Sequence, residues 1–522
     1  MAPLTSGRRT AVLATVCLAV FAINLDVTIV NVALPSMSRQ LGAGTSTLQW
    51  VVDGYSLAFA ALVLTGGSVG DRFGRRPVLI AGLLGFGVAA ALGGVFHSSA
   101  ALVALRFVMG AFAALIYPTT LSIITNTYPD RAERAVAIGV WGAVTGIGVA
   151  VGPVTGGLLL AHYWYGSVFL ALVPASFVAA ILAALIVPES REPGAAPVDL
   201  PGLLASSAAI GLLVYTIIEA PHYGWGAPRS IAGFAGTVLL GAVFVVVERR
   251  ARVPMIDVTL FRVPAFSAAS GAVTVSFFAL FGFIFLITQY LQYIRHYGAL
   301  STGTRILPVA VSIAVGSIVG ARLASRLGTR VIVVTGLALF GLSFAWIAVS
   351  AATEPYLQIA AQMVIMGTGL GLTSTPATES ILSVLPPAKA GIGSAVNDAT
   401  REAGGALGVA VIGSVFNSVY QHQLAASPLH TLPAAAYAAA RDSVSAALAL
   451  ARNADLANGV TNSFMDGLRF ACVIAAAVCW AGAVAALKLP GRQKPTPEIA
   501  IGTAERDVRT VAGEPGTKSG ID

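Results

Sequence analysis

Charged residues are scarce in this sequence. Only 10% of its 522 residues are Asp, Glu, Lys or Arg, while 56% are hydrophobic. A soluble protein carries about 25% charged residues, which it needs to cover a surface that faces water. The shortage excludes an ordinary soluble protein and indicates a chain whose main solvent is lipid.

Lysine, cysteine and histidine are also rare, and each shortage disfavours a function. None of the lysines follows a glycine, so the Gly-Lys-Ser/Thr sequence of an ATP-binding Walker A loop is missing. The three cysteines lie in apolar runs and form no CxxC pair, which disfavours a disulfide framework or a zinc site. The six histidines stand at no metal-ligand spacing. We therefore expect no metal, no cofactor and no enzymatic activity.

The sequence contains many long apolar runs. A bilayer core of about 30 Å needs about 20 apolar residues per helix. Runs of this kind lie near residues 10–34, 48–69, 78–96, 100–123, 134–159, 166–187, 201–219, 230–247, 265–290, 303–321, 330–351, 355–381, 389–418 and 463–488. The first run is long for a signal peptide and has no cleavage signature, so we interpret it as a span. The sequence predicts an all-α membrane protein with fourteen transmembrane helices.

The connecting loops predict the orientation of these helices. The net charge is +8, and the basic residues gather in alternate short loops, such as those holding Arg8, Arg9, Arg249 and Arg250. Such clusters are typical of cytoplasmic loops and do not require a nucleic-acid partner. We expect a multi-pass protein of the cytoplasmic membrane with both termini in the cytoplasm.

The runs divide into two sets of six with a pair between them. We predict an N-terminal bundle over 1–190, a two-helix insert over 191–262, and a C-terminal bundle over 263–490 with an external loop at 421–462. Residues 491–522 are polar and predict a disordered tail. The loop after the second helix of each set has a related sequence, at 67–76 and 321–330. This internal repeat predicts two pseudo-symmetric bundles.

Four motifs carry a family resemblance. The first is Leu25-Asp-Val-Thr-Ile-Val-Asn-Val-Ala-Leu-Pro35 in the first span, and the second is the loop Gly67-Ser-Val-Gly-Asp-Arg-Phe-Gly-Arg-Arg76. The third is Arg106-Phe-Val-Met-Gly110 in the fourth span, and the fourth is Gly148-Val-Ala-Val-Gly-Pro-Val-Thr-Gly-Gly157 in the fifth. Residues 397–405 in the thirteenth span add to them. The chain resembles the major facilitator superfamily and, within it, the fourteen-span drug:proton antiporter branch.

The resemblance implies a proton-driven secondary antiporter that exports lipophilic drugs or antibiotics by alternating access. It also implies a monomer that uses the proton gradient rather than a cofactor. The fifth-span motif G-x-x-x-G-P-x-x-G-G matches at every named position, which argues against an uptake symporter of the same fold. A dedicated self-resistance exporter of one natural product remains an alternative. Two positions depart from the usual pattern: Met109 stands where Gln is common, and Ser325 stands where the first loop has Asp71.

Ionisable residues inside spans are the candidates for proton coupling, because each is costly in lipid and is usually functional. Asp26, Asp53 and Arg106 fall at similar depth in the first bundle. Arg106 would hold a neighbouring carboxylate ionised until it moves away. Asp398 and Glu402 share one face of the thirteenth span and could form a second proton site, a contact for a cationic substrate, or a structural pair with Arg401. For Asp53 the alternative is an ordinary residue at a helix end.

The glycine motif and the short loop are candidates for moving parts. Gly148, Gly152 and Gly156 are spaced by four, so they line one face and permit close helix packing, while Pro153 weakens the helix. With Gly157 they predict a hinge between bundles, against the alternative of generic small-residue packing. The gating loop is Gly67, Asp71, Arg72, Gly74, Arg75 and Arg76. Its aspartate would pair with an arginine and lock the cytoplasmic side, unless the arginines act only as orientation signals.

A substrate cavity is predicted with less support. The ninth span is rich in phenylalanine, and aromatic side chains suit flat lipophilic molecules, although packing against lipid or core explains them equally. The candidates are Asn31, Tyr55, Arg401, Phe281 and Gln289. The acidic residues favour lipophilic cations as substrates.

Overall fold

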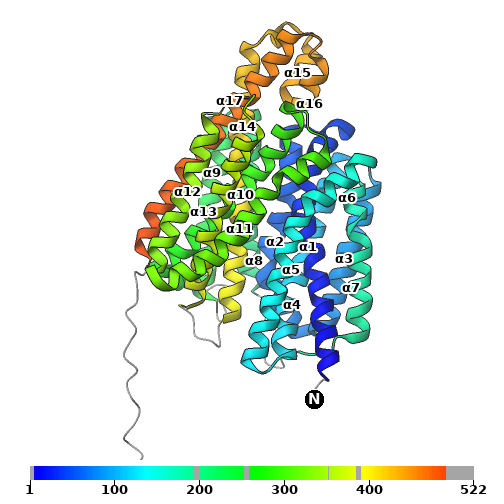
Figure 1. Ribbon diagram of the computed structural model, residues 1–522, viewed down its shortest axis with the longest axis vertical. Coiled ribbons are helices and arrows are strands. Elements are labelled where there is room, and N and C mark those ends of the chain that lie inside the picture. The colour runs from blue at the N-terminus through cyan, green and yellow to red at the C-terminus, as the bar shows by residue number, and fades with distance from the viewer. Residues whose placement is uncertain (1–4, 192–198, 252–257, 351, 384–389, 490–522) are drawn as a thin grey trace, which may run out of the picture.

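The computed structural model describes residues 5–191, 199–251, 258–350, 352–383 and 390–489, and these residues fold almost entirely into helices (Figure 1). The described part of the chain contains no β-strand. Among the described residues, thirteen helices are long and apolar enough to cross a membrane. The bent helix α2 (Thr45–Phe73), whose halves Thr45–Val63 and Thr65–Phe73 meet at 55°, is the fourteenth when it is counted as one span. The predicted all-α fold with fourteen spans is confirmed.

The first six spans form one side of the molecule in Figure 1. Besides α2 they are α1 (Ser6–Leu41), α3 (Arg75–Val95), α4 (Ser99–Thr127), α5 (Arg131–His162) and the nearly continuous pair α6 (Ser167–Leu170) and α7 (Leu172–Ile186). Helix α1 packs on α5 and α7, and α2 packs on α4. The α2–α4 contact depends on Gly110, because an added Cβ there would collide with the backbone carbonyl of Tyr55.

The last six spans form the second bundle. They are α10 (Pro264–Gln289), α11 (Ala299–Leu327), α12 (Thr329–Ala348), α13 (Tyr356–Ser383), α14 (Ala390–Ala426) and α17 (Ala454–Ala485). The inserted pair is α8 (Leu200–Tyr223) and α9 (Pro228–Arg250), of which α8 packs against α2 and α14. The predicted limits of the bundles and the insert stay predictions, and residues 491–522 lie outside the described residues.

The two ends of the molecule differ. The described chain begins at Thr5 and ends at Leu489 on one face, which we name the terminal face (Figure 1). The opposite face carries residues 427–453, which include α15 (Ala434–Asp442) and α16 (Val444–Leu450), and we name it the cap face. The stretch 421–462 is therefore mostly helical, because α14 and α17 both extend into it and two short helices join them. The Tyr420 hydroxyl fixes α15 by donating to the Ala440 carbonyl at 3.0 Å.

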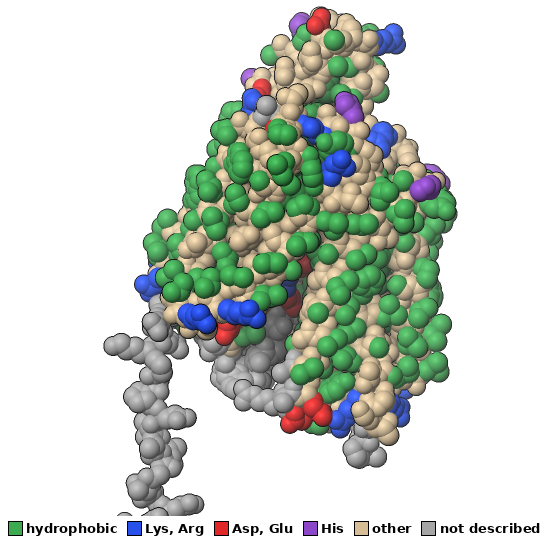
Figure 2. All heavy atoms as spheres, viewed as in Figure 1, with side chains coloured by type: hydrophobic (Ala, Val, Ile, Leu, Met, Phe, Trp, Pro, Cys, Tyr) green, Lys and Arg blue, Asp and Glu red, His purple; other side chains and the backbone are tan. Residues whose placement is uncertain are grey.

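The bundles touch near the cap face and part toward the terminal face. Near the cap face an added Cβ at Gly157 of α5 would lie 2.6 Å from the Ala299 carbonyl oxygen of α11. Figure 2 shows a hollow between the bundles that opens toward the terminal face, with charged side chains visible inside. On the half of α5 nearest that face, Gly139, Gly142 and Gly146 have no atom within 4 Å of an added Cβ. Within the described residues, the bundles are thus closed at the cap face and separated at the terminal face.

Candidate proton-coupling and transport site

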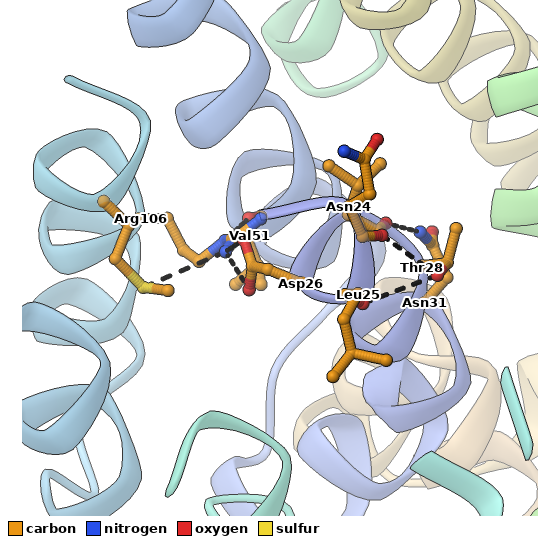
Figure 3. Close-up of polar contacts among 9 residues, drawn as sticks. Asn24, Leu25, Asp26, Thr28, Asn31, Val51 and Arg106 are labelled. Carbon is orange, nitrogen blue, oxygen red and sulfur yellow. Dashed lines mark hydrogen bonds and ion pairs between the residues drawn. The ribbon is translucent and has the colours of Figure 1, made fainter. Parts of the chain in front are cut away.

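A buried ion pair lies in the middle of the first bundle (Figure 3). Arg106 on α4 donates from Nη1 to both carboxylate oxygens of Asp26 on α1, at 2.9 and 2.7 Å. The side chains are 2% and 0% exposed. A pair this deeply buried has little value for stability compared with an apolar pair, so its retention favours a functional role.

Arg106 has further partners that fix its orientation, and two of them lie on α2. Its Nε donates to the Val51 carbonyl of α2 at 2.8 Å, and its guanidinium carbon lies 4.5 Å from the centre of the Tyr55 ring. Stacking of a cation on an aromatic face is favourable, more so away from water. The phenolic oxygen of Tyr55 is buried and has no hydrogen-bond partner among the described residues. Tyr55 therefore serves as a platform for the arginine.

The glycine motif of α5 packs on the same turns of α1 that carry Asp26. An added Cβ at Gly148 would lie 3.1 Å from Asn24 Cβ, and one at Gly156 would lie 2.9 Å from Ile29 Cγ1. At Gly152 it would collide with Thr28, whose hydroxyl donates to the Val149 carbonyl at 3.1 Å. Small residues at this spacing allow two helix backbones to approach closely. The glycine motif of α5 is therefore in direct contact with the segment of α1 that holds Asp26.

Asp53 on α2 is buried without a partner. It is 0% exposed, and neither of its carboxylate oxygens has a hydrogen bond within the described structure. Arg106 contacts Asp26 and does not bond to Asp53, although the sequence put all three at similar depth. An ionised carboxylate buried alone costs several kcal/mol. This conformation therefore accommodates Asp53 in its protonated form.

The charged cluster of α14 belongs to the other bundle. Arg401 and Asp398 are 3.7 Å apart, beyond hydrogen-bonding distance, and Arg401 also stacks on Phe277 at 4.4 Å. Glu402 faces the Ser56 hydroxyl of α2 across the bundle boundary. Its Oε2 atom is buried with no hydrogen bond from the described residues. The cluster thus combines a loose ion pair with a second acid.

Comparisons with known proteins identify the family. The model of the Major Facilitator Superfamily matches residues 16–409. This chain belongs to the major facilitator superfamily. It is 34% identical over 483 residues to the multidrug efflux pump LfrA of Mycolicibacterium smegmatis, covering 92% of this chain and 96% of that one. It is 32% identical over 493 residues to the tetracenomycin C resistance and export protein of Streptomyces glaucescens, covering 92% and 91%.

Solved structures of the superfamily share the fold. One is a bacterial homologue of the human lysosomal transporter Spinster, in an inward-facing and occupied conformation, with a TM-score of 0.67 and 15% identity over 92% of this chain and 97% of that one. The nucleoside transporter NupG gives a TM-score of 0.60 at 12% identity, over 91% and 99%. At these identities the likeness establishes the architecture alone.

The side chains of the predicted gating loop, residues 67–76, bond within the first bundle. Asp71 accepts a hydrogen bond from Arg75 Nε at 2.9 Å, and Arg76 donates to the Ala184 carbonyl of α7. Glycine suits position 74 for two reasons: its backbone has φ +104°, which other residues rarely adopt, and an added Cβ would lie 2.6 Å from Glu189 Oε1. Arg72 is exposed and Gly67 lies beside Pro118. The described contacts of the loop stay within the first bundle, in keeping with an open terminal face.

The predicted cavity residues divide by exposure. Arg401 has a side chain that is 36% exposed. The amides of Asn31 and Gln289 donate to carbonyls of their own helices, at 2.8 and 3.0 Å, and both residues are buried. Phe281 packs against the backbone of Gly405. The role of these residues in binding stays a prediction.

Sequence reasoning missed three polar residues at the bundle boundary: Gln49, Ser56 and Gln292. All three are at most 8% exposed. Each is a polar residue inside or at the end of an apolar run, and that was the available signal. An uncharged side chain carries too weak a signal to stand out among the many serines, threonines and glutamines of a membrane helix.

Proposed function

We propose that this chain is a proton-driven antiporter that exports lipophilic small molecules across the cytoplasmic membrane by alternating access. The observation that carries the proposal is the buried Asp26–Arg106 pair, against which the α5 glycine motif packs. A carboxylate beside a guanidinium can exchange that partner for a proton when the helices shift. Entry of one proton charge across 100 mV supplies about 2.3 kcal/mol, and a pH gradient adds to it.

The transport cycle follows from the two sets of acids. In the conformation described, Asp53 fits as a neutral acid and Asp26 as an ion paired with Arg106. The hollow at the terminal face would admit substrate from the cytoplasm or the inner leaflet. We assign substrate contact to Arg401, whose side chain is 36% exposed, and to the acids beside it on α14. Opening at the cap face would release the substrate outside and let protons reach these acids. The chain would act as a monomer, without a cofactor and without catalysing a chemical reaction.

The orientation and the substrate class belong to the same proposal. The terminal face would be cytoplasmic, as the basic loops predict. Relatives named for multidrug efflux and for tetracenomycin C export support drug-like substrates, and their names do not favour uptake. The relative named for tetracenomycin C keeps a dedicated antibiotic exporter as a second candidate, which transport of one compound within a panel would reveal.

Ethidium uptake into inside-out vesicles tests the proposal. Vesicles energised by respiration should accumulate the dye, a protonophore should abolish this, and Asp26→Asn should lack it. Asp466→Asn is the matched control, because Asp466 pairs with Arg469 at 3.1 Å on the surface of α17. Uptake that a protonophore leaves unchanged would contradict proton coupling. Coupled uptake that survives in Asp26→Asn but not in Asp53→Asn would transfer the proton role to Asp53.

A further inference from the structure

A buried glutamine joins the two bundles where α2 meets α14. Gln49 is 0% exposed, and its amide nitrogen lies 3.2 Å from the Val409 carbonyl, 3.1 Å from the Ala410 carbonyl and 3.3 Å from the Ser414 hydroxyl. An amide has two hydrogens, so three acceptors compete for them. All the acceptors lie on a helix of the other bundle. This side chain therefore fastens α2 to α14.

A glycine on α14, Gly413, leaves room for the Gln49 amide. An added Cβ at Gly413 would lie 2.6 Å from the Gln49 amide nitrogen. The nearest atoms around that position all belong to the Gln49 side chain, whose far end is flexible. An alanine at 413 would press on the glutamine amide, and the atoms of every other residue lie at least 3.1 Å from its Cβ. Glycine at this position is thus matched to the glutamine.

A second glutamine joins the bundles at another boundary. Gln292 lies in the π-helical turn Tyr290–Ile294 that ends α10, and its amide donates to the Val32 carbonyl of α1 at 3.0 Å. Arg295 anchors this turn within its own bundle by donating to the Glu354 carbonyl at 2.6 Å. Turns of this type interrupt a helix and often occur at functional positions. The turn holds Gln292 against the other bundle.

Both bonds lie toward the cap face. Gln49 is four residues from the cap-face end of α2, whereas Asp53 and Ser56 follow it toward the terminal face. Gln292 is at the cap-face end of α10. The hollow of Figure 2 opens on the opposite side. An opening at the cap face that separates α2 from α14, or α1 from α10, would therefore break one or both of these bonds.

We propose that Gln49 and Gln292 are positioning residues that hold the cap-face gate closed while the terminal face is open. The proposal rests on alternating access as set out above, and it adds the residues that set the balance between the two states. We name these two contacts latches. Each joins an uncharged side-chain amide to uncharged acceptors, so protonation of the acids leaves it unchanged. A typical intramolecular hydrogen bond shifts such an equilibrium roughly two- to tenfold.

A single reporter cysteine can measure the gate. Ser38 of α1 is 5% exposed, and its hydroxyl lies 3.1 Å from the hydroxyl of Ser443 beside α16, in the other bundle. In the full chain with the three native cysteines replaced by alanine, Ser38→Cys is labelled by a membrane-impermeant maleimide added at the cap face. Separation of the bundles exposes the thiol, so the labelling rate follows the fraction of open gates.

The latch variants are Gln49→Leu, Gln292→Leu and Gly413→Ala. Each should raise the labelling rate roughly two- to tenfold over the parent. Gly413→Ala keeps the glutamine and only displaces it, so it remains informative if Gln49→Leu folds poorly. The controls are Gln421→Leu, a buried glutamine bonded within its own bundle to Asn417 and Arg441, and Gly271→Ala, which has open space around an added Cβ.

The outcomes separate this inference from the proposed function. Labelling of the latch variants at the parent rate, or equal acceleration by Gln421→Leu, would overturn it. The labelling needs no substrate and no proton gradient. If the parent chain transports no ethidium but the latch variants are labelled faster than the parent, the inference about the gate stands and the export proposal fails.

Discussion

Replacing Asp26 by Asn should destabilise the protein through the arginine that it leaves behind. Asp26 and Arg106 are 0% and 2% exposed, so no water can replace the lost carboxylate. Breaking a buried pair by removing one partner costs about 3–5 kcal/mol. Arg106 keeps the Val51 carbonyl and the Tyr55 ring, which partly compensate its charge. We therefore expect a loss near the lower limit, about 3 kcal/mol, or roughly a hundredfold in the unfolding equilibrium.

A double variant tests whether the charge is the cause. Asp26→Asn with Arg106→Leu removes both ions, and replacing a whole buried pair by uncharged residues is often close to neutral. The double variant should recover at least about 2 kcal/mol of the loss. The assay is unfolding by dodecyl sulfate in mixed micelles at fixed pH, followed by circular dichroism.

The surface pair supplies the control for this measurement. Asp466 and Arg469 have side chains that are 32% and 46% exposed. Removing an exposed pair of this kind costs about 0–1 kcal/mol. The reasoning from burial is refuted if Asp26→Asn lowers the free energy of unfolding no more than Asp466→Asn does. It is also refuted if the loss of stability in the double variant equals the sum of the losses measured for Asp26→Asn alone and Arg106→Leu alone.

Three further outcomes are expected. Asp53→Asn keeps a buried, unpaired polar side chain of the same size but cannot carry a proton, so proton-driven ethidium uptake should be lost while micelle unfolding shows a loss of stability of at most about 1–3 kcal/mol. A larger loss would mean that Asp53 has a partner that Asn cannot replace. Gly152→Val should abolish ethidium uptake because the new side chain collides with Thr28, whereas Gly146→Val, which has open space around an added Cβ, should transport normally. Equal effects of the two variants would contradict the packing argument. Burial raises the pKa of Glu354, in the loop after α12, above its ordinary value of 4.5, so its contribution to stability is present below that pH and is lost as the pH rises through the folded-state pKa. Glu354→Gln should therefore flatten the dependence of melting temperature on pH in that range. An unchanged profile would contradict this expectation.

Several features were readable from the sequence because lipid imposes local rules. A helix in a bilayer must satisfy its own backbone and present about 20 apolar residues, so each span is visible without knowledge of its neighbours. The same rule makes an ionised residue in a span conspicuous. Asp26, Arg106 and the α14 cluster were predicted in this way as coupling residues, and that role stays a prediction. The structure shows that Asp26 and Arg106, which the sequence puts at similar depth, are in contact.

The rotation of the helices and the meeting of the bundles were decided by the tertiary structure. The depth of a residue in its span does not show whether Arg106 points toward Asp26 or Asp53. That depends on how closely the glycines of α4 and α5 allow the neighbouring helices to pack. The bonds of Gln49 and Gln292 join residues 360 and 260 positions apart. Lipid sets the length and composition of every span, but it acts equally on all sides of a helix. Which face meets which partner is set by side-chain packing between distant segments, and that information is absent from any single span.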